Sequence, residues 1–319
     1  MACRFQVYFN AGQYPDAAQA AMTALDEVDR LESLLSVYRG DSEVSLVNQT
    51  VGKEPLPIGP ELMELLALAL QLHAETGGAF DVTAGPLSEA WGFARQAGRM
   101  PGDAQLAAAL ARVGSGYVEI HHANQTVQFA RQGVQLNFGG IGKGYALDVA
   151  SRLLQAQGIQ DFLFHAGRSS VLACGDRAVG AGPSGDGPRR EGGWKVGLIH
   201  PQRPQVRLAE VRLRDRALAT SGSQMQSFHH RGRRYGHILD PRTGRPSSGL
   251  LSVTVLAATA AVADALSTAL FVMGADAAAR FCEQHAQIGA ILVTGGAGKK
   301  RLQVLPLNLS EADWQLLSD

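Results

Sequence analysis

Asp264 and Thr268 are the two residues whose types and spacing most clearly allow chemistry. They lie four residues apart in an almost wholly apolar stretch, so a helix would place both on one face. A lone carboxylate is costly to bury unless it is paired or binds a cation. Two oxygen ligands without a neighbouring His or Cys suit a hard cation such as Mg²⁺. The structural alternative is that Asp264 caps a neighbouring loop and Thr268 bonds its own helix backbone.

A glycine-rich turn at 136–145 is a second candidate, because it feeds directly into a predicted helix. Bare backbone amides at the positive end of a helix accept phosphate. The turn is not a P-loop: with Lys143 as the motif lysine, Asn137 stands where the first Gly belongs and Gly144 where Ser or Thr belongs. A tight turn that only permits close packing is an equally good interpretation.

His237 is the candidate base, at a point where a strand-like run meets an Asp-Pro turn. A His with a pKa near neutrality can take a proton from a hydroxyl, although histidines at strand ends are often plain structural donors. The other histidines show no ligand spacing, and we expect them at the surface. Residues 220–222 (Thr-Ser-Gly) lack a nucleophile elbow, so we interpret them as a turn that faces a phosphate or a ring.

Composition limits the kind of protein. The 319 residues carry 29 Lys and Arg against 29 Asp and Glu, and this neutral balance argues against a general nucleic-acid binder. Cys3, Cys174 and Cys282 lie far apart and form neither a metal pair nor a disulfide framework. We expect no transmembrane segment and find no signal peptide. The expected location is therefore the cytoplasm or, if the chain has been trimmed, the cell envelope or periplasm.

Hydrophobic periodicity predicts the elements that must position these residues. Helices are expected at 21–35, 61–74, from the glycine-rich turn to 157, 260–273 and 276–285. Strands are expected at 3–9, 162–166, 195–199, 206–213, 251–257, 288–293 and 301–305, with a hairpin within 117–130. A Gly- and Pro-rich stretch at 180–193 predicts a mobile loop. Because no regular βαβ rhythm is present, the fold class is α+β.

Several segments, taken in order along nearly the whole chain, resemble the flavin transferases of the ApbE family. Residues 1–3 resemble the family's opening Met-Gly-Thr, and 36–48 resemble its first flavin-contacting loop. Residues 78–93 are similar to a very specific family signature. The remaining matches lie at 137–148, 219–222, 237–244 and 263–268. The resemblance implies a single domain over 1–319, related to the T-fold, with mixed helices and antiparallel sheets in two closely packed lobes.

The resemblance also implies an activity and a set of site residues. The chain would be a Mg²⁺-dependent FAD:protein FMN transferase that moves FMN from FAD to a threonine of an acceptor flavoprotein and releases AMP. Asp264 and Thr268 would hold Mg²⁺ by their side chains, with a backbone carbonyl near Gly140 as a third ligand. His237 would be the base and, with Asp264, catalytic. The implied FAD contacts are Met1, Ser36, Tyr38, Ala79, Phe80, Asp81, Asn137 and Lys143.

Two departures from the family pattern keep other functions open. Asn137 stands where the family usually has an acidic residue, and 165–170 replace a Gly-Gly-Asp-like stretch and include Arg168. Arg168 would change how the pyrophosphate or the acceptor peptide is held. The alternatives are a metal-dependent FAD pyrophosphatase, which releases FMN and AMP without an acceptor, and a non-catalytic FAD-binding protein. We expect Asp264→Ala to abolish covalent flavin and to leave the protein folded, because it removes an unpaired buried charge.

Overall fold

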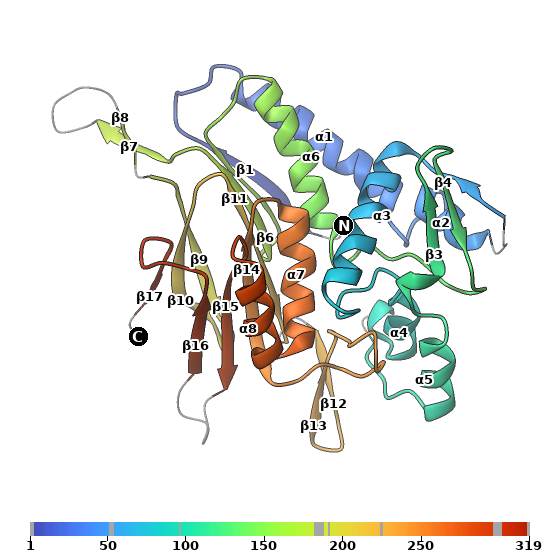
Figure 1. Cartoon of the computed structure of the whole chain (residues 1–319). Coiled ribbons are helices and arrows are strands. Elements are labelled where there is room, and N and C mark those ends of the chain that lie inside the picture. Colours follow the sequence, from blue (N-terminus) through green and yellow to red (C-terminus); the bar gives the residue numbers. More distant parts are fainter. Residues whose placement is uncertain are drawn as a thin grey trace.

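The computed structural model describes residues 3–50, 54–95, 97–181, 188–190, 192–223, 226–295 and 302–317. Its centre is a seven-stranded sheet in which all neighbouring strands are antiparallel (Figure 1). In spatial order the strands are β1 (Phe5–Phe9), β5 (Phe162–Ala166), β6 (Ser170–Cys174), β11 (Arg216–Gly222), β14 (Leu250–Ala257), β15 (Gly289–Gly295) and β16 (Leu302–Leu307). The mixed α+β class predicted from the sequence is confirmed.

Both faces of this sheet are covered. Helices α1 (Ala17–Leu35), α6 (Gly142–Ala156), α7 (Ala260–Met273) and α8 (Ala275–Gln284) pack on one face (Figure 1). A small sheet packs on the other, with strand order β17 (Trp314–Leu316), β10 (Arg203–Leu213) and β9 (Trp194–His200). In β15, Ala290 and Leu292 belong to the core under the helices, whereas Ile291 and Val293 belong to the core under the small sheet. Burial on both faces explains why β15 is almost continuously apolar.

Helices α6 and α7 come very close together at Gly144. A Cβ built on Gly144 would lie 2.1 Å from the carbonyl oxygen of Ala260, so no other residue fits there without moving a helix. Asp148, one turn further along α6, accepts the backbone N–H groups of Ala260 and Ala261 at 2.7 and 2.8 Å. Its carboxylate satisfies amides at the start of α7 that have no partner within the helix. Gly144 and Asp148 together fix the position of α7 on α6.

A second group of elements, which includes α3 (Pro60–Glu75), lies beside α7 (Figure 1). It comprises α2 (Glu43–Gln49), β2 (Leu56–Pro57), α3, α4 (Gly85–Ala90), η1 (Phe93–Arg95), α5 (Asp103–Leu110), η2 (Ser115–Tyr117), β3 (Val118–His121) and β4 (Thr126–Phe129). The other described elements are two hairpins, one of β7 (Ala178–Ala181) with β8 (Pro188–Arg190) and one of β12 (Ser227–His230) with β13 (Arg233–Gly236). Among the described helices, none has the length and apolar character needed to cross a membrane.

The structure confirms each predicted helix and strand, with differences only at their ends. Three local predictions need correction. Residues 220–222 are not a turn but the end of β11, where they pair with β14. His200 is buried and accepts two backbone N–H groups, so it is not a surface residue. The stretch 180–193, predicted as a loop, contains strand residues of β7 and β8, while 182–187 and 191 lie outside the described residues.

Candidate functional site

A cleft of about 500 Å³ gathers the residues that the sequence singled out. Its walls come from the loop after α3, the glycine-rich turn before α6, the end of β11, the segment after β13 and the helix α7. Every predicted site residue in the described part of the chain lines this cleft, except Ser36. Met1 lies outside the described residues. Segments far apart in the sequence therefore meet at one hollow, as the resemblance implies.

Asp264 is the centre of a polar cluster on the cleft wall. Both its carboxylate oxygens lie 3.2 Å from Nζ of Lys143. The backbone N–H of Gly144 donates to Oδ2 at 3.2 Å, and the hydroxyl of Ser170 donates to Oδ1 at 3.1 Å. The Asp264 side chain is only 7% exposed and that of Lys143 is 22% exposed. The expectation of an unpaired buried carboxylate is therefore wrong, because Lys143 on α6 is its partner.

Thr268 and Gly140 border the same part of the cleft as Asp264. The hydroxyl of Thr268 lies 3.2 Å from the hydroxyl of Ser221. A Cβ built on Gly140 would lie 3.8 Å from the hydroxyl oxygen of Thr268. All the available donors are oxygens: a carboxylate, hydroxyls and a backbone carbonyl. Across the described ranges, no group of three or more His, Cys, Asp and Glu side chains could hold a metal. This donor set fits a hard cation such as Mg²⁺ and does not fit zinc.

His237 lines the cleft directly after β13, and its protonation state follows from its partner. Nδ1 lies 3.1 Å from the carbonyl oxygen of Gln226. Because a carbonyl only accepts, Nδ1 carries the proton and Nε2 is the basic atom. Burial lowers the pKa of His237 and the charge of Lys143 lowers it further, and together they outweigh the bond to Gln226. His237 is therefore neutral at pH 7 and can accept a proton from a hydroxyl.

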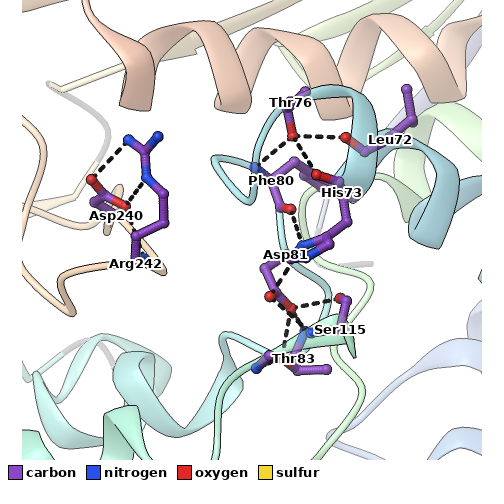
Figure 2. A network of polar contacts seen from close by, with 10 residues as sticks. Leu72, His73, Thr76, Phe80, Asp81, Thr83, Ser115, Asp240 and Arg242 are labelled. Carbon is purple, nitrogen blue, oxygen red and sulfur yellow. Dashed lines mark hydrogen bonds and ion pairs between the residues drawn. The ribbon is translucent and has the colours of Figure 1, made fainter. Parts of the chain in front are cut away.

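Asp81 lines the cleft, but its carboxylate is turned into the protein (Figure 2). Oδ1 accepts the N–H of Thr83 at 2.7 Å and the hydroxyl of Ser115 at 2.8 Å, and Oδ2 lies 3.2 Å from Nδ1 of His73. Burial raises the pKa of Asp81, but these bonds outweigh it and leave the pKa below its usual value. The bond to Asp81 raises the pKa of His73. The carboxylate therefore fixes its own backbone on the cleft wall, and His73, which it holds, also lies 3.0 Å from the carbonyl oxygen of Phe80.

Asn137 opens the glycine-rich turn and is anchored through its own backbone. Its N–H donates to the carbonyl of Val82 at 2.6 Å, and its Oδ1 accepts the N–H of Gly139 at 2.9 Å. The side chain of Asn48 pairs with both backbone groups of Leu136, at 2.7 and 2.9 Å. These bonds fix the turn from two sides. The side-chain nitrogen of Asn137, Nδ2, makes no hydrogen bond within the described chain and can donate to a ligand.

A second hollow of about 650 Å³ shares Tyr38, Gly85 and Asn137 with the cleft. Tyr38 is 77% exposed at this junction, so its ring is available to a ligand. Ser36 borders neither hollow. Its hydroxyl oxygen accepts the backbone N–H of Tyr38 at 3.4 Å, a weak bond that supports the loop. Ser36 therefore positions Tyr38, and a direct contact of Ser36 with flavin stays a prediction.

Sequence reasoning missed some of the residues that complete the site. Ser170 bonds Asp264, and the sequence marked it only as part of the departure at 165–170. Gln226 sets the tautomer of His237, a role that has no signal in the sequence. Ser221 bonds both Ser267 and Thr268, and its place in a matched segment was the available signal. Arg168, noted as a departure, is exposed and lines the cleft. The cleft therefore has a second cation besides Lys143.

The fold and the cleft define an α+β protein with a partly buried cleft that is lined by oxygen donors and by the cationic side chains of Lys143 and Arg168. A sequence model of the ApbE family matches residues 1–292, and the chain belongs to this family. The FAD:protein FMN transferase of Vibrio cholerae is 33% identical over 290 residues, which cover 88% of this chain and 82% of the relative. The FAD:protein FMN transferase of Treponema pallidum is 31% identical over 303 residues, 91% of this chain and 81% of the relative.

Solved structures agree with the family match. The flavin transferase ApbE from Vibrio cholerae superposes with a TM-score of 0.82 at 28% identity, covering 98% of this chain and 95% of that chain. The flavinyl transferase ApbE of Pseudomonas stutzeri, in its apo form, gives a TM-score of 0.78 at 28% identity, with 96% and 94% coverage. The resemblance inferred from the sequence motifs is therefore confirmed.

Proposed function

We propose that this chain uses Mg²⁺ to transfer FMN from FAD to a threonine hydroxyl of an acceptor flavoprotein, with release of AMP. The chain is a flavin transferase of the ApbE family, as its family match and its named relatives show. The dependence on Mg²⁺, the threonine target and the leaving group are the parts that we propose here.

The residues that would hold Mg²⁺ are Asp264 and Thr268 through their side chains and Gly140 through its carbonyl. Support comes from the oxygen-only donor set and from the common position of these residues on the cleft wall. A bound divalent cation would neutralise charge on the diphosphate of FAD. Lys143 and Arg168 add positive charge to the same cleft, which favours a diphosphate there.

His237 is the group suited to activate the acceptor. In the proposed step, Nε2 takes the proton of the threonine hydroxyl as its oxygen attacks the phosphorus of the FMN half. The new O–P bond forms, the bond between that phosphorus and the bridging oxygen breaks, and AMP leaves with the electron pair. The bond from Nδ1 to the Gln226 carbonyl keeps the ring in the required tautomer and stabilises the imidazolium that results.

The observation that carries the proposal is the convergence of Asp264, Thr268 and His237 on one cleft beside Lys143. The test incubates the chain with FAD, Mg²⁺ and an acceptor flavoprotein from a relative, and measures the intact mass of the acceptor and the AMP released. We expect one FMN added per acceptor, on a threonine, and one AMP released. Addition of EDTA should stop both. Release of FMN and AMP without any gain in acceptor mass would instead support the pyrophosphatase.

A further inference from the structure

The β12–β13 hairpin is strongly basic in a chain of zero net charge. From Gln226 to Leu239 it carries three arginines and three histidines, and no Asp or Glu. The basic side chains cluster around the turn of the hairpin, where His229 pairs with Arg234 and His230 pairs with Arg233 across the strands, and Arg231 occupies the turn. Such a local excess of one charge creates a field that attracts a partner of opposite charge.

The positive charge of this hairpin is available to a partner. Arg231 and Arg233 are exposed, and no carboxylate in the described part of the chain forms an ion pair with either. The guanidinium of Arg233 lies over the ring of Tyr235, 5.5 Å from its centroid, which leaves its N–H groups open to an anion. Arg234 differs, because it is folded back and donates to the hydroxyl of Ser227 and the carbonyl of Ser223.

A cluster of aromatic side chains packs against the base of the hairpin and supports it. Phe228 and Tyr235 are directly opposite each other on the two strands. Their rings stack, with centroids 5.4 Å apart and an interplanar angle of 18°. Trp91 and Phe93 pack against this pair. The ring centroid of Trp91 lies 5.7 Å from that of Tyr235, and the ring centroid of Phe93 lies 5.8 Å from that of Phe228. A two-stranded ribbon alone is barely stable in water, and this aromatic cluster supplies the missing support.

Both ends of the hairpin run into the candidate active site. Gln226 precedes β12 and His237 follows β13, and both line the cleft. On its other side the hairpin packs on the segment around Gly98, where a built Cβ would lie 2.7 Å from the ring of Phe228. That same segment lines the second hollow and includes the exposed Arg99. A peptide bound along the hairpin would therefore continue into the cleft that contains Nε2 of His237.

We propose that the β12–β13 hairpin is the docking surface for an acidic segment of the acceptor protein, next to the threonine that receives FMN. This inference rests on the proposed function, because it assumes a protein acceptor. We favour a protein over a lipid surface or a nucleic acid because the strands of the hairpin lead into the cleft that contains His237, the proposed base. Charges at the edge of an interface act mainly on association rate and on salt dependence.

The test uses Arg231→Glu and Arg233→Glu in the FAD-loaded full chain. Arg280→Glu on α8 is the matched control, because Arg280 is exposed, lines neither hollow and undergoes the same charge change. The probes are a fluorescein-labelled peptide with a central threonine flanked by aspartates, and its counterpart with asparagines. Fluorescence anisotropy gives both affinities in low and high salt, and anionic phospholipid vesicles are tested by co-sedimentation.

We expect the wild-type chain to bind the aspartate peptide more tightly than the asparagine peptide, and this preference to fade in high salt. Each hairpin substitution should weaken the aspartate peptide about fivefold, and Arg280→Glu should leave it unchanged. Equal affinity for the two peptides, an equal effect of Arg280→Glu, or binding of vesicles alone would overturn the inference. Peptide affinity needs no chemistry, so failure of the proposed function would appear separately, as absence of FMN mass on the acceptor.

Discussion

Replacing Asp264 with Asn tests the centre of the site, because it keeps the shape of the side chain and removes its charge. In the wild type, Lys143, Gly144 and Ser170 all donate to this carboxylate. In the variant, one carboxylate oxygen becomes an NH₂ group, so at least one of these donors faces another donor. The ammonium of Lys143 also loses its counter-charge.

The cost to stability follows from the exposure of the two partners. Removing one partner of a fully buried ion pair costs about 3–5 kcal/mol, and an exposed pair is worth about 0–1 kcal/mol. Asp264 is 7% exposed, but Lys143 is 22% exposed and can turn partly toward water. We therefore expect Asp264→Asn to lower the free energy of unfolding by about 2 kcal/mol. The sequence alone led to the opposite expectation, that removing the charge of Asp264 would not destabilise the protein.

The cost to activity should be larger than the cost to stability. Loss of a charge placed to organise the diphosphate should lower the single-turnover rate of FMN transfer by about 10²- to 10³-fold, or roughly 3–4 kcal/mol. Urea denaturation gives the stability, and the mass of the acceptor against time gives the rate.

Asp148→Asn is the matched control for this experiment, because Asp148 is also a buried aspartate of the α6–α7 contact but does not line the cleft. It should destabilise the protein while the folded fraction transfers FMN at near wild-type rate. If Asp264→Asn transferred FMN as fast as Asp148→Asn, the role given to Asp264 would be refuted.

Three further substitutions test other parts of the site. His237→Gln should slow transfer about 10²- to 10⁴-fold, and wild-type single-turnover rates should fall with an acid limb below pH 6.5, because the pKa of the base is lowered. Gly144→Ala should cost about 3 kcal/mol or more in urea denaturation, since the new Cβ would overlap the Ala260 carbonyl. His73→Gln should remove the stabilisation that the ion pair of His73 with Asp81 gives, which is complete between pH 3.8 and 6.5. In the wild type this stabilisation is lost as the pH rises through the raised pKa of His73, and also as the pH falls through the lowered pKa of Asp81. Thermal unfolding of both proteins across this pH range measures the difference.

The elements that the sequence predicted well are those with a strong local signal. Strand β5 is a short, mostly apolar run followed by Gly167, and helix α7 is a longer apolar stretch followed by Gly274; the structure places both as expected. The β12–β13 hairpin was not predicted, because its exposed residues are mostly His and Arg and do not alternate with apolar ones. The end of β11 was taken for a turn for a similar reason: Thr220 and Ser221 face the cleft, so their polarity reflects a site and not a loop.

The sequence predicted which segments line the cleft, but not the directions of their side chains. Motif matches brought the right segments together, yet they could not show that Lys143 pairs with Asp264, a residue 121 positions away. Nor could they show which way a carboxylate points. Asp81 was expected to contact FAD, and the structure turns its oxygens toward His73, Thr83 and Ser115. Such orientations depend on tertiary packing, which no local pattern encodes.

The packing of α6 on α7 and the chemistry of the cleft depend on the same few residues. Only glycine allows α6 to approach Ala260 as closely as it does, and this approach brings the N–H of Gly144 within 3.2 Å of Asp264. Lys143, the preceding residue, reaches the same carboxylate. Asp148 then locks the start of α7 to α6 through two backbone amides. A change that forces the helices apart at Gly144 should therefore weaken the charged cluster as well as the core, so Gly144→Ala should lower stability and transfer activity together. Asp148→Asn keeps the close approach at Gly144, so it should lower stability alone.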